Sequence, residues 1–132
     1  MSRPPFTIKN LMEIEDSVAG RAEGIEGRFA RGHMDSEHLG VSLFRYGAGV
    51  RSPFAHSHRE QEEAYVVVSG SGRVLLDGEI HPLHTWDVLR ISPEVVRSFE
   101  AGAQGLDLIA IGADRPEGGD GVMAEPAWPD EG

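Results

Sequence analysis

Two histidines one residue apart, followed by a carboxylate, are the feature of this chain that most directly suggests chemistry. The stretch HSHREQEEAYVVVSG, residues 56–70, holds His56, His58 and Glu63 ahead of a run of valines that ends at a glycine. Side chains at positions i and i+2 of a strand point to the same face. Two imidazoles and one carboxylate that meet there would suit Fe(II), Mn, Ni or Zn and would leave coordination positions open.

Short strands are the elements that must position these residues. Runs rich in Val, Ile, Leu and Phe recur between Gly and Pro residues, and no convincing amphipathic helix longer than about two turns interrupts them. Residues 10–16 are compatible with one short helical turn. The glycines of GSG (70–72) and the pair Asp77-Gly78 are predicted hairpin turns. The pattern predicts an all-β sandwich or barrel. The expected strands are 25–31, 40–46, 62–69, 72–77, 87–92, 96–101 and 106–112.

Other residues have plainer expected places. The interior is predicted to include Phe44, Phe54, Val67, Val74, Leu76, Leu89, Ile91 and Phe99. The remaining histidines, His33, His38, His81 and His84, are expected at the surface, and Pro82 is expected to interrupt strand pairing. The last residues are rich in Pro, Gly and acids, so we expect a loosely held tail without a strand, unless Trp128 and Met123 fasten it.

Composition excludes several classes of function. The formal net charge is -10, with 22 acidic against 12 basic side chains, which argues against nucleic-acid and anionic-membrane partners. The chain has no cysteine, so disulfides, thiolate metal sites and cysteine nucleophiles are excluded. No signal peptide and no membrane-spanning apolar run is visible, so a cytoplasmic location is expected.

The histidine stretch resembles the first motif of the cupin family, the small double-stranded β-helix barrels. That motif reads G-x5-H-x-H-x3/4-E-x6-G, and this chain offers Gly49, His56, His58, Glu63 and Gly70 with one extra residue before the first histidine. The resemblance implies one all-β domain with a jelly-roll-like barrel. Residues 1–39 would supply N-terminal strands and loops, 40–112 the barrel core, and 113–132 a tail.

Three glutamates compete for the carboxylate position of the motif. Glu62 fits the shorter permitted spacing after His58, but only Glu63 also leaves six residues before Gly70. Glu63 also shares the parity of Tyr65 on the expected strand. We therefore expect Glu63 to point inward, and Glu60 and Glu62 to lie in solvent.

The second cupin motif, G-x5-P-x-G-x2-H-x3-N, is matched less well. Trp86-Asp87 replaces the usual Gly-Asp turn, Pro93 aligns with the motif proline, and Phe99 follows as an aromatic. Arg97 stands where the family has its fourth ligand, a histidine.

An arginine stays protonated in a protein and cannot ligate a metal. About 5 Å from a divalent cation, its repulsion would be roughly 7 kcal/mol at an effective dielectric constant near 20. Three placements of Arg97 stay open. It can swing outward and leave a three-ligand site, replace the metal by pairing with Glu63, or stay at the mouth and hold an anionic group of a ligand.

The resemblance implies a small-molecule site inside the barrel, with His56, His58 and Glu63 as ligands of a divalent metal. Arg97, Tyr65, Tyr46 and Phe99 would contact the bound molecule. One hypothesis is a metal-dependent enzyme of the dioxygenase, isomerase, decarboxylase or lyase type. The other is a metal-free binding or sensing module in which Arg97 replaces the fourth ligand. A homodimer is expected from the family alone.

Overall fold

The protein is almost entirely β-structure. The computed structural model describes residues 3–130, and within them it has no α-helix and one 3-10 turn, η1 (Leu11–Glu13). None of the described helices is long and apolar enough to cross a membrane. The strands are β1 (Ile25–Phe29), β2 (Gly40–Tyr46), β3 (Ala55–His58), β4 (Glu63–Leu76), β5 (Glu79–Leu83), β6 (Val88–Ile91), β7 (Arg97–Gly112) and β8 (Gly121–Ala124).

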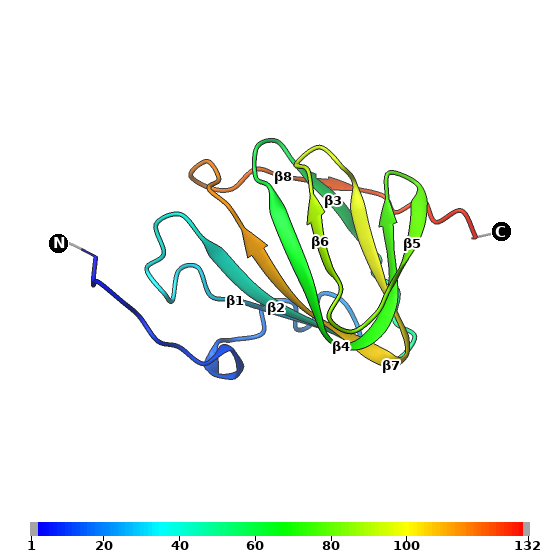
Figure 1. Cartoon of the computed structure of the whole chain (residues 1–132), viewed down its shortest axis with the longest axis horizontal. Coiled ribbons are helices and arrows are strands. Elements are labelled where there is room, and N and C mark those ends of the chain that lie inside the picture. Colours follow the sequence, from blue (N-terminus) through cyan, green and yellow to red (C-terminus); the bar gives the residue numbers. More distant parts are fainter. Residues whose placement is uncertain (1–2, 131–132) are drawn as a thin grey trace.

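The eight strands form one antiparallel sheet that curls back on itself (Figure 1). Strands β4 and β7 pair along nearly their whole lengths, so that the start of one lies beside the end of the other. The end of β7 continues the sheet through β2 to β1, and its start continues it through β3 to β8. Strands β6 and β5 pair with the first and second halves of β4. This curled sheet is the predicted all-β barrel.

Two long strands stand where four shorter ones were predicted. The GSG at 70–72 lies inside β4 and does not turn the chain back, so the predicted hairpin is wrong. The pairing of β4 with β7 shifts register between Gly70 and Gly72, which marks a β-bulge. Gly70 has a φ of 76°, and a side chain on it would collide with the carbonyl of Gly105. The glycines therefore bend a continuous strand.

Three strands were absent from the predicted set. Strand β3 carries the histidine pair. Strand β5 contains Pro82, which pairs with Arg73, so the predicted interruption at this proline is wrong. Because β5 pairs only with β4, the proline lies on an edge strand, where a missing N–H is tolerated. The predicted turn at Asp77-Gly78 does connect β4 to β5.

The third unpredicted strand, β8, lies in the segment predicted to have none. It pairs with β3 through four residue pairs, from Ala55↔Ala124 to His58↔Gly121. Beyond it, Trp128 is only 3% exposed, and the guanidinium of Arg51 lies 4.4 Å from the centre of its ring. The tail is therefore tied to the barrel, and β8 covers the strand that bears the histidines.

The core fills the space inside the curled sheet. Inward residues of both halves form one cluster, which holds Val67, Leu106 and Leu108 at its fully buried centre. Val74, Ile91 and Phe99 are buried as predicted, whereas Phe54 is wrongly predicted as core, because 45% of it is exposed. Burial of this apolar surface, at about 25 cal/mol per Å², is the main force holding the barrel closed.

Candidate metal centre

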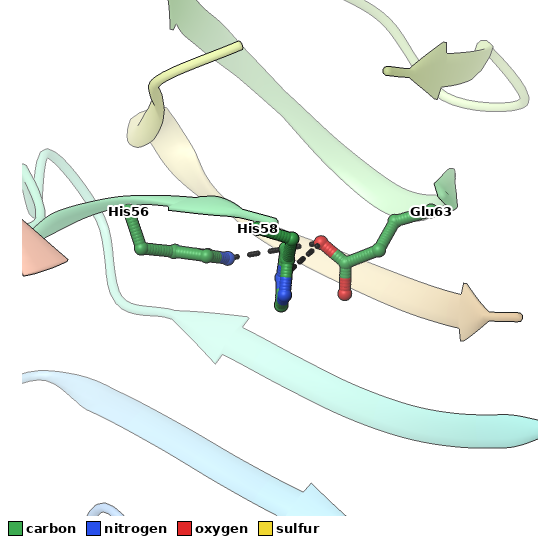
Figure 2. A group of neighbouring side chains, drawn as sticks. All are labelled: His56, His58 and Glu63. Carbon is green, nitrogen blue, oxygen red and sulfur yellow. Dashed lines mark ion pairs between the residues drawn. The ribbon is translucent and has the colours of Figure 1, made fainter. Parts of the chain in front are cut away.

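Strands β3 and β4 bring the two histidines and the glutamate together (Figure 2). Side-chain nitrogens of His56 and His58 and a carboxylate oxygen of Glu63 all lie within 4.8 Å of one another. Glu63 Oε1 is 3.2 Å from His58 Nε2 and 3.7 Å from His56 Nε2. The two imidazole rings meet nearly at right angles, with centres 5.0 Å apart. The i, i+2 spacing on β3 thus directs both rings to the face where β4 begins.

An aspartate of the tail contacts the nitrogen of His58 that does not face Glu63. Its Nδ1 lies 2.9 Å from Asp120 Oδ1, while the other oxygen of Asp120 accepts hydrogen bonds from the amides of Glu60 and Gln61, each at 2.7 Å. Burial raises the pKa of Asp120, but the two amides and His58 outweigh it and lower the pKa to about 2. Asp120 is therefore ionised and fixes the orientation of the His58 ring.

The carboxylate of Glu63 is the charged centre of the group. Its Oε1 accepts a hydrogen bond from the Tyr65 hydroxyl at 2.7 Å and one from Arg97 Nη1 at 3.2 Å. Burial raises the pKa of Glu63, but its interactions with His56, His58 and Tyr65 hold that pKa well below the ordinary value. Burial, and then the charge of Glu63, raises the pKa of Tyr65. Glu63 is thus ionised and Tyr65 keeps its proton.

Arg97 pairs with Glu63, which is the contact expected in the second of its three placements. It is completely buried at the start of β7, opposite His56 in the register of β3 and β7. Nη1 pairs with Glu63, and Nη2 donates to the carbonyl of Ser92 at 2.8 Å. The guanidinium neither swings outward nor stands free at the mouth, and its two terminal nitrogens serve Glu63 and the backbone rather than the histidines.

The tautomer of His58 tests whether these residues fit a metal. A carboxylate accepts only, so the proton of the neutral ring lies on Nδ1 beside Asp120, and Nε2 carries a lone pair. That lone pair faces Glu63 Oε1 at 3.2 Å, and two acceptors this close need a cation between them. Within residues 3–130, Nε2 is buried and makes no hydrogen bond of good geometry, although interaction with Glu63 raises the pKa of His58.

The spacing of these residues also suits a divalent metal. Two ligand atoms that are each about 2.1 Å from one metal lie roughly 3.0–3.5 Å apart. The separations of 3.2 and 3.7 Å from Glu63 to the histidines are close to that range. The donor set is imidazole and carboxylate, which Fe, Mn, Ni and Zn accept. The three residues therefore fit a divalent metal, with Asp120 orienting one of its ligands.

Two cavities meet beside the histidines. The inner one, about 140 Å³, is mostly apolar and is lined by residues including Tyr46, Phe99 and Arg97. The outer one, about 440 Å³, contains His58 and Glu63 in its wall. His56 and Tyr65 line both. The group of metal-ligating residues thus lies where a small, mostly apolar cavity adjoins a larger one.

The remaining predicted site residues have clear places. Tyr46 and Phe99 are buried in the inner cavity, with ring centres 6.3 Å apart, and burial raises the pKa of Tyr46. The hydroxyl of Tyr65 is already bonded to Glu63. Glu60 and Glu62 are exposed, as expected, and Glu62 pairs with Arg90 at 2.9 Å. His33, His38, His81 and His84 are exposed as predicted, outside both cavities.

Two residues of the site were missed by sequence reasoning. Asp120 lies 62 positions beyond His58 in a Gly-rich, acidic segment, and nothing in that segment distinguishes it from its acidic neighbours. Gln61 lines the outer cavity and was overlooked among the glutamates around it. Only the pairing of β8 with β3 brings Asp120 to the histidine.

Comparisons with known proteins agree with this geometry. The cupin domain family model matches residues 42–111, which is more than half of the chain. A cupin protein from Bacteroides fragilis is 30% identical, with a TM-score of 0.64 over 83% of this chain and 88% of its own. The chain belongs to the cupin family. No curated protein matched.

More distant solved structures share the fold. A salicylate 1,2-dioxygenase from Pseudoaminobacter salicylatoxidans is 20% identical, with a TM-score of 0.63 over 72% of this chain and 26% of its own. A variant of oxalate decarboxylase from B. subtilis is 18% identical, with a TM-score of 0.71 over 91% of this chain and 33% of its own. The chain spans about a quarter to a third of these two larger proteins. At these identities the likeness concerns the barrel alone.

Proposed function

We propose that this protein is a metal-dependent enzyme that acts on a small molecule inside the barrel. The metal is held by His56, His58 and Glu63. The observation that carries the proposal is the buried Nε2 of His58, which has no hydrogen bond within residues 3–130 and faces the carboxylate of Glu63. A bound divalent metal would supply Lewis-acid activation of a substrate oxygen.

The residues around the ligands have distinct parts in this proposal. Asp120 keeps the proton of His58 on Nδ1 and so leaves Nε2 free for the metal. Tyr65 and Arg97 both donate to Glu63 Oε1, the oxygen that also faces the two histidines, and so fix its position. The buried apolar wall of the inner cavity excludes water from a bound molecule. The homodimer expected from the family stays a prediction.

A metal-free binding module is the second candidate, favoured by the pairing of Arg97 with Glu63. A fully buried guanidinium 3.2 Å from the carboxylate supplies one of the positive charges that a metal would bring. In that case His58 would carry the proton that separates it from Glu63, and interaction with Glu63, opposed by burial, does raise the pKa of His58. The two candidates differ in whether a metal stabilises the fold.

Thermal unfolding of the untagged, chelator-stripped chain in increasing Mn, Fe(II), Ni or Zn distinguishes the candidates. A metal that binds only the folded state stabilises it by mass action, by about 2.7 kcal/mol at a hundredfold excess over Kd. We expect a rise in Tm with at least one metal, and loss of that rise in His56→Ala, whose partly exposed ring can be removed without opening the core. His81→Ala, which removes an exposed histidine, is the matched control and keeps the rise. No rise with any metal would support the metal-free module.

A further inference from the structure

Two arginines line the rim of the outer cavity, and the proposed metal centre does not use them. Arg31 follows β1 and Arg115 follows β7, and both line the cavity that contains His58 and Glu63. The loops after β1 and β7 lie at the same end of the barrel (Figure 1), and Arg31 Nη2 donates to the carbonyl of Ala113 at 2.9 Å. The two guanidinium groups thus belong to one opening.

Within residues 3–130, neither arginine of this pair is engaged in a direct ion pair. In the described part of the chain, neither Arg31 nor Arg115 has a carboxylate oxygen within ion-pair distance. Burial, and then the charge of Arg115, lowers the pKa of Arg31, and the charge of Asp114 opposes this shift, so both side chains lie within electrostatic reach of Arg31. Asp114, the nearest acid in sequence, has its carboxylate 3.0 Å from His38. In a chain of net charge -10, two arginines at one cavity without a direct ion pair to any described residue form a site that attracts anions.

A glycine makes room for Arg31. A side-chain carbon on Gly40 would come within 2.7 Å of Arg31 Nη2 and 2.9 Å of its Nε, so the guanidinium lies flat against the backbone of β2. Gly40 faces Gly112 across β2 and β7. The space beside Gly112 holds the amide of Gln61, whose Nε2 donates to the same Ala113 carbonyl at 2.9 Å. Backbone and side chains together therefore hold Arg31 at the rim.

Much of the wall of the outer cavity is apolar. Phe29, Phe44, Phe54 and Met123 line the outer cavity. Three of them are unusually exposed for large apolar residues, at 42% for Phe29, 45% for Phe54 and 67% for Met123. A volume of about 440 Å³ lies within the range of small-molecule sites. The cavity thus combines two arginines, an apolar wall and the metal-ligating residues.

We propose that Arg31 and Arg115 bind the anionic head group, a carboxylate or phosphate, of a small molecule with an apolar body. Guanidinium forks form paired, charge-assisted hydrogen bonds with such oxygens. The apolar body lies against the phenylalanines of the outer cavity, and the end opposite the head group reaches His56. This inference names the substrate class of the proposed function and rests on it only for the reacting end. Recognition of anions is therefore assigned to this pair and not to Arg97.

Titrations with benzoate, hexanoate and phenyl phosphate test the head group directly, and benzamide and hexanamide are the neutral matches. We expect at least one anion to bind the full chain roughly tenfold more tightly than its neutral match, as one charged hydrogen-bonded contact would give. Arg31→Gln and Arg115→Gln should each abolish the preference. Gly40→Ala should weaken it while leaving both charges in place, because only the flexible end of Arg31 must move.

Arg21→Gln is the matched control, because Arg21 is exposed and lines neither cavity. Equal binding of anions and amides, no binding of any probe, or an equal loss in Arg21→Gln would overturn the inference. Carboxylate and phosphate arms separate the two head groups. Each titration is run with and without the metal that gives the largest rise in Tm. If the chain prefers anions over amides but the metal changes neither Tm nor probe binding, only the proposed function is contradicted. If the metal changes them but anions and amides bind equally, only this inference is contradicted.

Discussion

Arg97 and Glu63 carry opposite charges inside the barrel, and their pairing affects both the stability of the barrel and the binding of a metal by the histidines. Arg97 has no exposed surface, and its partner carboxylate is only 13% exposed. Removing one member of a buried pair leaves the other charge uncompensated, which costs about 3–5 kcal/mol. A divalent metal on Glu63 would compensate that charge instead. The pair thus stabilises the metal-free barrel and opposes the metal at the same time.

Arg97→Gln should therefore separate the two effects. We expect the metal-free variant to lose about 3–5 kcal/mol of unfolding free energy. Added metal should restore more stability in the variant than in the natural chain, because the repulsion between Arg97 and the metal is gone. Urea unfolding with chelator and with metal measures both quantities. Arg97→Lys, which keeps a positive charge, is the control, and an equal metal effect in all three chains would contradict the prediction.

Asp120 acts on the same site through His58. Asp120→Asn keeps the shape of the side chain but removes the charge that holds the Nδ1 proton, so the ring becomes a weaker and less oriented ligand. We expect metal affinity to fall by about tenfold to a hundredfold, the usual effect of changing such a partner. Isothermal titration of metal into the stripped variant gives the affinity. Unchanged affinity, with the fold intact by circular dichroism, would mean that Asp120 serves only to close the loop at Glu60.

At the scale of elements, the turn before β6 carries a strained residue. Trp86 has a φ of 75°, a left-handed conformation that favours glycine, and 74% of it is exposed. The cupin motif has a glycine at this turn, and the hydrogen bond from the Trp86 amide to the carbonyl of Val67, at 2.7 Å, keeps the geometry that such a glycine would give. The backbone thus keeps the turn although the residue type has changed.

Trp86→Gly should be more stable than Trp86→Ala by about 1 kcal/mol, because alanine also pays the steric cost of a left-handed backbone. Alanine is at least as stabilising as glycine at ordinary positions, so the order of the two variants is the diagnostic result. Thermal unfolding of both, side by side, provides the comparison. If the alanine variant were the more stable, the turn would not be strained.

The segment before β1 is fastened by one carboxylate. Asp16 Oδ1 accepts hydrogen bonds from the amides of Gly27, at 2.9 Å, and Val18, at 3.0 Å. These two bonds lower the pKa of Asp16, that from Gly27 most. They hold Val18 against the inner cavity, whose wall it forms together with Ile25. The inner end of the barrel is therefore closed by a segment that depends on an ionised aspartate.

This dependence gives a pH effect of definite sign. Because the pKa of Asp16 is lower in the folded state, its contribution to stability is present above the unfolded value of about 3.9 and is lost as pH falls through the folded value. We expect the natural chain to have a higher Tm than Asp16→Asn at neutral pH, and the difference to shrink below about pH 4. Tm measured for both chains across this range tests the sign. A difference that grows toward acid would contradict it.

Local pattern predicted the strands whose residues alternate or are β-branched, and these build most of the barrel. The local sequence pattern gave a wrong prediction where the same residue type is compatible with two backbone structures. Glycines at 70 and 72 allow either a reversal or a bulge, and only the partner strand β7 decides for the bulge. Pairing also makes strands of β5 and β8, whose sequences have weak strand preferences. The histidines and Glu63 were predictable because their spacing is local, whereas Asp120 depends on a long-range contact.

At the scale of the whole molecule, the site depends on segments outside the part that matches the family model. Residues 42–111 carry the histidines, Glu63 and Arg97. Asp120 comes from the tail that β8 attaches to β3, and the loop after β1 supplies Arg31. Trp128, stacked on Arg51, closes the far end of that tail. The barrel provides the metal-ligating residues, and the flanking segments orient them and shape the mouth.

The central claim is that the barrel binds one divalent metal despite the buried arginine. Elemental analysis of the full chain, purified without an affinity tag and dialysed against each metal, tests it most directly. We predict about one metal per chain in the natural protein, as three ligands on one chain imply, and loss of that metal in His56→Ala and His58→Ala. His81→Ala, with its exposed ring removed, should retain the metal. Absence of stoichiometric metal from the natural chain, or its retention when both site histidines are replaced, would contradict the claim.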